Sequence, residues 1–162
     1  MKPYTNKVDD NNFGTFSSTE SVFETQQPTI DLSEMAVILL IEDDEAVRKV
    51  VSRRLQNSGF YVLEAANGHE GAEIFRRHHS RVNLIVSDVT MPHLTGTQML
   101  KQLRTEYGHL PPVVITTGYT SHERDLIEVR ADAVLQKPMG VNELLEVIHD
   151  LLELSGTSIK HL

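Results

Sequence analysis

From residue 36 onward, short runs of apolar residues alternate with segments whose apolar residues recur at helical spacing. A continuous apolar run such as 37–41 (VILLI) is typical of a strand in a parallel sheet, because helices cover both faces of such a sheet. Runs of this kind predict strands at 36–41, 60–64, 82–87, 112–116 and 133–135.

The segments between these runs carry apolar residues three and four positions apart, which is the spacing of one face of an α-helix. They predict helices at 44–57, 68–78, 95–106, 121–129 and 141–154. The buried face of the first of these helices is expected to consist of Val47, Val50, Val51 and Leu55. Because strand and helix alternate along the chain, the pattern predicts a doubly wound α/β fold with right-handed crossovers.

Residues 1–33 differ from the rest, because they are rich in Asn, Ser, Thr, Gln and Asp and their aromatic residues show no periodic spacing. Such a segment buries too little apolar surface to offset the entropy of ordering, so we expect a disordered N-terminal tail. A docking peptide that folds on a partner is the alternative. Residues 34–155 are then expected to form one domain, and residues 156–162 a C-terminal tail too short for an output domain.

Composition excludes several classes of function. The chain has no cysteine, which excludes disulfides, thiolate metal sites and cysteine nucleophiles. The net charge of −8, with basic pairs only on predicted helix surfaces, disfavours direct binding of nucleic acid. The longest apolar stretch is too short to cross a bilayer, and the N-terminus lacks the apolar segment of a secretory signal. We therefore expect a cytoplasmic protein with no membrane partner.

Polar residues gather at the carboxyl ends of the predicted strands, where ligands bind in open α/β sheets. They are Glu42-Asp43-Asp44 after the first strand, Ser87-Asp88 at the third, Thr116-Thr117-Gly118 at the fourth and Lys137-Pro138 after the fifth. Neighbouring strands bring these side chains to one crevice, where several carboxylates would repel one another unless a cation compensates their charge. Mg²⁺, which prefers oxygen ligands, suits such a site.

The same crevice offers groups that suit a phosphoryl group. Lys137 brings a mobile positive charge for a phosphoryl oxygen, and the hydroxyl of Thr117 or the backbone N–H of Gly118 can donate to another. A carboxylate can act as the nucleophile toward phosphorus and form an aspartyl phosphate. Phosphoryl transfer needs mainly positioning and charge neutralisation, which these residues can supply.

Four stretches taken together resemble the receiver domains of bacterial two-component response regulators, the chemotaxis-regulator-like superfamily. They are 37–44 (VILLIEDD), 84–96 (LIVSDVTMPHLTG), 113–118 (VVITTG) and 136–138 (QKP). The resemblance covers about residues 36–154, and the presence of all four motifs in order makes it specific. It implies a five-stranded parallel sheet in the flavodoxin-like order 2-1-3-4-5, with helices on both faces.

By position, the resemblance implies that Asp88 is the phosphoacceptor. Glu42 and Asp43 match the acidic pair that holds Mg²⁺, with Asp43 as a direct ligand and Glu42 acting through water. The backbone carbonyl of Thr90 matches a further ligand. Asp44 falls one position later and is expected to cap the first helix, because its carboxylate can accept from the first N–H groups there.

The resemblance also implies that Thr117 and Lys137 bind the phosphoryl group, with Thr116 on the opposite face of the strand. The bond between Lys137 and Pro138 is expected to be cis, a state normally confined to proline. Gly96 matches the glycine that follows the loop after the third strand.

One position departs from the pattern of the family. Val134 stands where family members usually place Tyr or Phe, whose rotamer couples to the threonine. Any switching is therefore expected to depend on Thr117 and the loop through Tyr119 rather than on residue 134. Thr90 and Tyr119 match the positions that flank the approach of water, so the rate of self-hydrolysis is expected to depend on them.

The function implied is a phosphorylation-dependent signalling switch. The phosphoryl group would reach Asp88 from the phosphohistidine of a sensor histidine kinase or a histidine phosphotransfer protein, in a Mg²⁺-dependent step. Output would go through protein–protein contacts with a downstream target. Such a domain catalyses only its own phosphorylation and dephosphorylation.

Three alternatives remain open at this point. A degenerate receiver would keep the fold and work as an unphosphorylated interaction module. An aspartyl-phosphate phosphatase would need a second carboxylate two residues after the nucleophile, where this chain has Thr90. A flavodoxin-like electron carrier would need a phosphate-binding loop after the first strand, where the carboxylates of this chain would repel an anion.

Overall fold

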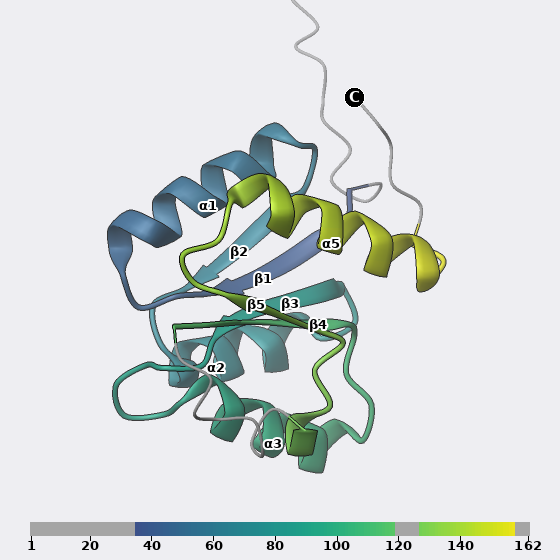
Figure 1. Cartoon of the computed structure of the whole chain (residues 1–162). Helices are drawn as coiled ribbons and strands as arrows, with labels where there is room; N and C mark the ends of the chain where they lie inside the picture. Colours follow the sequence, from purple (N-terminus) through teal and green to yellow (C-terminus); the bar gives the residue numbers. More distant parts are fainter. Residues whose placement is uncertain (1–34, 119–126, 158–162) are drawn as a thin grey trace, which may run out of the picture. The chain divides into compact units, whose positions relative to one another are not determined.

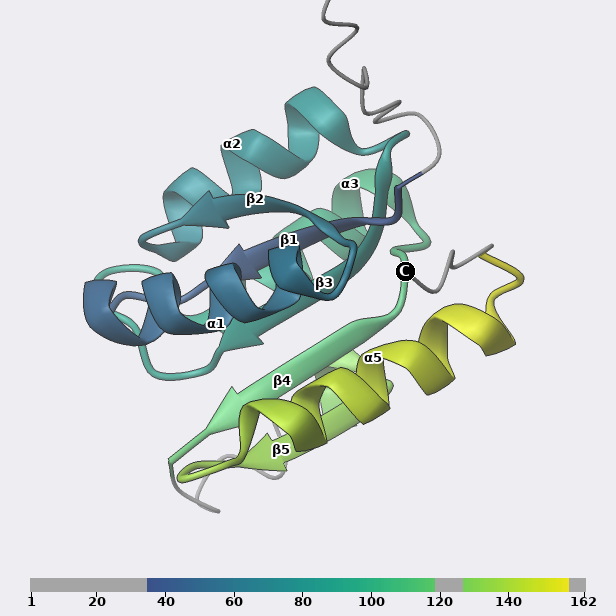
Figure 2. The ribbon, with the colours of Figure 1, turned by 90° about the horizontal axis from the view of Figure 1, so that it is seen from above.

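The computed structural model describes residues 35–118 and 127–157. In this part of the chain, five parallel strands form one sheet in the order β2-β1-β3-β4-β5. The strands are β1 (Val37–Ile41), β2 (Tyr61–Ala65), β3 (Val82–Asp88), β4 (Val113–Thr117) and β5 (Ala133–Gln136). All five arrows point the same way in Figure 2, so their carboxyl ends lie along one edge of the sheet.

Helices cover both faces of this sheet. α1 (Glu45–Asn57) and α5 (Val141–Leu154) lie on one face, and α2 (Gly68–His78) and α3 (Gly96–Tyr107) lie on the other (Figure 1). The doubly wound α/β fold and the strand order 2-1-3-4-5 are thereby confirmed. Within the described residues, no helix combines the length and the apolar composition that crossing a bilayer requires.

Side chains of the central strands alternate between two cores, because successive residues of a strand point to opposite faces. In β1, Leu39 and Ile41 pack in the core with residues of α2 and α3, whereas Ile38 and Leu40 pack with residues of α1 and α5. Every residue of β1 is buried, which explains why the sequence of this strand is continuously apolar. Polar side chains therefore begin only beyond the end of the strand, at Glu42.

The sequence places each described element to within one residue of its observed bounds. Of the helix expected at 121–129, only residues 127–129 are described, and they are helical. The tail expected at 1–33 and residues 158–162 lie outside the described residues. The domain boundaries at 34 and 155 therefore stay predictions.

The expected buried face of α1 is partly wrong. Val51 and Leu55 are buried, but Val47 and Val50 are 39% and 62% exposed. The inward positions of the first turns belong instead to the Arg48 side chain, which is 15% exposed, and to Ser52, which is buried. The apolar pattern alone predicts the wrong face here, because the side chains of Arg48 and Ser52 form polar contacts on the inward side of the helix.

Gly96, the first residue of α3, allows this helix to approach the end of β3 closely. A Cβ atom at this position would lie 2.1 Å from the carbonyl oxygen of Asp88 and 2.6 Å from Ser87 Oγ. The N–H of Gly96 donates a hydrogen bond to the carbonyl of Val89 at 3.2 Å. A side chain at residue 96 would therefore push α3 away from the residue that closes β3.

We expect the substitution Gly96→Ala to lower the free energy of unfolding by about 1–3 kcal/mol, because the closest atom is backbone that cannot turn aside. Urea denaturation monitored by circular dichroism measures the change. Gly118→Ala is the matched control, because a Cβ atom there meets nothing within 4 Å. Equal stability of the two variants would contradict the close approach.

Candidate functional site

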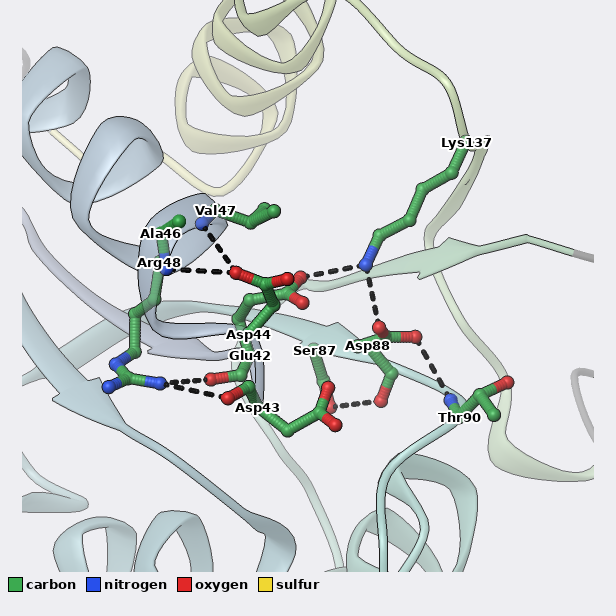
Figure 3. A network of polar contacts seen from close by, with 10 residues as sticks. All are labelled: Glu42, Asp43, Asp44, Ala46, Val47, Arg48, Ser87, Asp88, Thr90 and Lys137. Atoms are coloured by element: carbon green, nitrogen blue, oxygen red, sulfur yellow. Dashed lines mark hydrogen bonds and ion pairs between the residues drawn. The ribbon is translucent and has the colours of Figure 1, made fainter.

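Three strand ends bring a lysine and two buried carboxylates together. Glu42 follows β1, Asp88 closes β3 and Lys137 follows β5. The ammonium nitrogen of Lys137 donates to Glu42 Oε2 at 2.8 Å and to Asp88 Oδ2 at 2.6 Å (Figure 3). Glu42 and Asp88 are only 5% and 6% exposed. The convergence expected from the sequence is therefore present for these three residues.

Asp88 is held through its other carboxylate oxygen and its backbone as well. Asp88 Oδ1 accepts a hydrogen bond from the backbone N–H of Thr90 at 2.9 Å. The hydroxyl of Ser87, which is fully buried, donates to the carbonyl of Asp88 at 3.0 Å. One oxygen of the carboxylate thus contacts a backbone donor and the other contacts a cation, so the side chain has a fixed orientation.

Asp43 completes an acidic cluster at the mouth of the site. Its side chain is exposed, and one carboxylate oxygen from each of Glu42, Asp43 and Asp88 lies within 4.8 Å of the other two. Three carboxylates share this space with one lysine, so the cluster keeps an excess of negative charge. Hard oxygen donors with a negative charge fit a divalent cation such as Mg²⁺.

Two groups of the site, the carboxyl of Glu42 and the ammonium of Lys137, have shifted pKa values. Burial raises the pKa of the Glu42 carboxyl above its ordinary value, although the hydrogen bond from Lys137 opposes this shift. For Lys137, burial disfavours the charged ammonium, but the hydrogen bonds to Asp88 and Glu42 outweigh it and raise the pKa. Lys137 is therefore charged at neutral pH and serves as the counter-ion of the site.

The first turn of α1 confirms the role expected of Asp44. Its carboxylate oxygen Oδ1 accepts hydrogen bonds from the backbone N–H groups of Ala46 at 2.8 Å and Val47 at 3.0 Å. Asp44 is thus the N-cap of α1. This leaves Glu42 and Asp43 as the acidic pair of the loop.

The other expected site residues lie at the ends of β4 and β5. Thr117 is buried, and its carbonyl accepts a hydrogen bond from the backbone N–H of Lys137 at 2.8 Å. Thr116 precedes it on the alternating strand and so faces the opposite side. The bond between Lys137 and Pro138 is cis, as expected. Tyr119 lies outside the described residues.

Sequence reasoning missed one residue next to the acidic pair. The Arg48 guanidinium nitrogen Nη1 donates to the carbonyl of Glu42 at 2.6 Å and lies 3.5 Å from the carbonyl of Asp43 (Figure 3). A signal for it exists, because Arg48 lies in the first turns of α1, near the positive end of the helix dipole, where a cation is unfavourable without another partner.

Residues 38–149 match the model of the response regulator receiver domain. Among curated proteins, the sensor kinase CckA of Brucella abortus is 35% identical over 125 residues, which cover 76% of this chain and 13% of the kinase. The chain spans about half the length of the response regulators that it matches, for example 50% of one that is 38% identical.

The solved structures that are similar to this chain include a chemotaxis protein and a response regulator. The chemotaxis protein CheY4 of Vibrio cholerae is 32% identical, with a TM-score of 0.67 over 73% of this chain and 99% of that one. The response regulator protein TrrA of Thermotoga maritima, solved in complex with Mg(2+)-BeF, is 26% identical, with a TM-score of 0.65 over 73% of this chain and 100% of that one.

The ion pairs of Lys137 lead to a prediction about pH. A raised pKa of Glu42 means that the folded state holds this proton more tightly than the unfolded state, so this group favours folding at low pH and loses that contribution as the pH rises. Lys137→Met removes the counter-ion and raises the pKa of Glu42 further. We expect the variant to be less stable than the unmodified protein by about 1–3 kcal/mol near neutral pH.

The deficit should grow as the pH rises through the raised pKa of the Glu42 carboxyl, because Glu42 then ionises without a partner. Urea denaturation in EDTA at several pH values measures it. The double variant Glu42→Gln, Lys137→Met is the control, and it should lose most of this growth with pH. A deficit that shrinks as the pH rises would contradict the ion pair.

Proposed function

The chain belongs to the response regulator receiver domain family, and on that premise we propose that it is a signalling switch controlled by phosphorylation of Asp88. It is a receiver domain of two-component systems and hence a signalling domain. The observation that carries the proposal is the placement of Asp88. Its buried carboxylate contacts the ammonium of Lys137 and lies in one cluster with the carboxylates of Glu42 and Asp43.

In the proposed reaction, a carboxylate oxygen of Asp88 attacks the phosphorus of a phosphohistidine on a sensor histidine kinase or a histidine phosphotransfer protein. The O–P bond forms while the P–N bond breaks, and the electron pair of that bond stays on the donor's imidazole nitrogen. Lys137 exchanges its contact with Asp88 for a phosphoryl oxygen. The second contact of the ammonium, with Glu42, keeps the lysine beside the site throughout.

Mg²⁺ would be held by Asp43, Asp88 and the backbone carbonyl of Thr90, with Glu42 acting through water. When bound, the ion supplies positive charge that neutralises the oxygens of the transferring phosphoryl group. The exposed carboxylate of Asp43 beside the buried one of Asp88 supports this ligand set. The Thermotoga protein was solved in complex with Mg(2+)-BeF, which supports Mg²⁺ as the ion of this proposal.

The surface beside the site supports a protein as phosphoryl donor. An apolar hollow of about 420 Å³ lies between α1 and the residues that follow β5, and Lys137 contributes to its wall. Its lining includes Val47, Val50, Pro138 and Met139. A donor that brings its histidine to Asp88 comes close to Lys137, and Lys137 also lines this hollow. We infer that the exposed valines of α1 form part of the donor contact.

We propose that the switch runs through Thr117 rather than through residue 134. Val134 is 46% exposed on the edge strand β5 and has no ring to exchange between an inward and an outward position. Thr117 is bonded through its carbonyl to the backbone of Lys137, so a shift of the lysine reaches β4 directly. Phosphorylation adds charge that only one of two states pairs well, which biases the equilibrium between them.

The same proposal includes output through contacts with a downstream protein and a cytoplasmic location. It also includes the absence of direct binding to nucleic acid or to a membrane. The net charge of −8 supports the part that concerns nucleic acid. The dependence of self-hydrolysis on Thr90 and Tyr119 is a further part. For Thr90, the hydrogen bond from its N–H to Asp88 Oδ1 supports this part, because Asp88 is the residue whose phosphoryl bond water would cleave.

Incubation with phosphoramidate and Mg²⁺ should add the mass of one phosphoryl group to the protein, as measured by intact-mass spectrometry. We expect Asp88→Asn to abolish this gain, because an amide oxygen is a far weaker nucleophile. Asp43→Asn should slow it at least about tenfold at limiting Mg²⁺, since it removes a direct ligand. Asp150→Asn, an exposed aspartate of α5, is the control. Labelling that persists in Asp88→Asn would place the acceptor elsewhere.

Val50→Glu should slow phosphorylation by a protein donor at least about tenfold, because it puts a charge into the apolar hollow. The donor is a histidine kinase that labels the unmodified chain, identified by screening purified kinases. Labelling by phosphoramidate should be unchanged, since this small donor needs no docking. Leu154→Glu, at an exposed site near the end of α5, is the control. Equal slowing with both donors would contradict a docking role.

A further inference from the structure

A polar chain of residues runs from the edge of the sheet to the back of the acidic pair. Arg48 donates from Nη1 to the carbonyl of Glu42 at 2.6 Å, and the same atom lies 3.5 Å from the carbonyl of Asp43. Its Nε lies 3.7 Å from Glu64 Oε2. Glu64 belongs to β2, and its other oxygen accepts a hydrogen bond from the buried hydroxyl of Ser52 at 2.6 Å.

These contacts fix the backbone of the acidic pair from two sides. On one side, the N–H of Glu42 donates to the carbonyl of Ala65, at the end of β2, at 3.1 Å. On the other side, Arg48 holds the carbonyl groups of Glu42 and Asp43. A fixed peptide plane fixes the direction in which the next side chain leaves the backbone. The exposed side chain of Asp43 therefore starts from a backbone that has little freedom to move.

The position of Arg48 is not explained by the helix that carries it. A cation in the first turns of α1 opposes the helix dipole, and its side chain occupies an inward position that an aliphatic residue would otherwise fill. The guanidinium group can reach two carbonyls and a carboxylate at once because its donors are spread over a planar fork. The geometry thus points to a role in the loop rather than in the helix.

We propose that Arg48 is a positioning residue for binding of the divalent cation. Arg48 holds the backbone of Asp43 so that its carboxylate is oriented to bind the ion, and Glu64 and Ser52 in turn align Arg48. The proposal rests on the function proposed above, because it assigns a purpose to the acidic pair. Residues behind the direct ligands commonly change metal affinity by about 10–100-fold when they are replaced. For Arg48 this effect is transmitted through backbone carbonyls rather than through a ligand side chain.

Electrostatics and positioning predict opposite results when Arg48 is removed. Loss of a nearby positive charge alone would make the acidic cluster more attractive to Mg²⁺ and would tighten binding. Loss of the backbone contacts would release the loop and weaken binding. The direction of the change in the Mg²⁺ dissociation constant therefore separates the two effects.

Isothermal titration of the full chain with MgCl₂ is the test. We expect Arg48→Met to raise the dissociation constant at least about tenfold. Arg53→Met, at an exposed arginine of the same helix, removes the same charge and should leave the constant unchanged or slightly lower. An Arg48→Met constant equal to or below that of Arg53→Met would overturn the proposal.

Two further variants separate the proposed role of Arg48 from a general loss of folding. Arg48→Lys keeps the charge but loses the planar fork, and it should bind Mg²⁺ with intermediate affinity. Glu64→Gln should weaken Mg²⁺ binding in the unmodified background and have little effect in the Arg48→Met background, because Glu64 acts through the arginine. Thermal unfolding in EDTA shows that each variant is folded. Independent effects of Glu64→Gln in the two backgrounds would count against the alignment.

The outcomes also distinguish this proposal from the proposed function. At saturating Mg²⁺, Arg48→Met should regain phosphoramidate labelling of Asp88, since only metal affinity is impaired. If the unmodified chain neither binds Mg²⁺ nor accepts a phosphoryl group, the proposed function is wrong. If it does both and Arg48→Met retains its affinity, only the role of Arg48 is wrong.

Discussion

One ammonium group holds the ends of three strands together. Lys137 lies between Glu42 and Asp88, which are both buried and both acidic. Two such carboxylates without a counter-ion would each lose much of their hydration with no compensation. The surrounding contacts complement this arrangement. The backbone N–H of Thr90 donates to the other carboxylate oxygen of Asp88, and the guanidinium group of Arg48 donates to the backbone carbonyl of Glu42.

The same lysine connects the chemistry to the rest of the sheet. Its side chain contacts residues that follow or close β1 and β3, whereas its backbone N–H donates to Thr117 at the end of β4. In the proposed switch, a change at Asp88 that draws the ammonium to a new oxygen would reach β4 through the backbone of Lys137 and its hydrogen bond to Thr117. This short path is consistent with a two-state response in which local charge alters a neighbouring strand.

Much of this architecture could be predicted because the signals are local. A central parallel strand must be apolar throughout, so β1 is visible as VILLI, and the polar residues that follow it mark the edge where ligands bind. Asp44 was predictable as a cap because capping depends on neighbouring N–H groups. The exposure of Val47 and Val50 was not, since it depends on which polar residues find partners across the molecule. Arg48 and Ser52 occupy the inward positions because both contact Glu64, which belongs to β2.

The two ends of α1 are consequently held by different forces. Toward its C-terminus, Leu55 is fully buried in the core, so that end cannot separate without exposing apolar surface. Toward its N-terminus, the helix is held by the cap of Asp44 and by the charged contacts of Arg48. Polar contacts at a surface open at lower free energy than a packed core. The attachment of α1 beside the acidic pair therefore depends on charge, whereas its attachment at the other end depends on apolar burial.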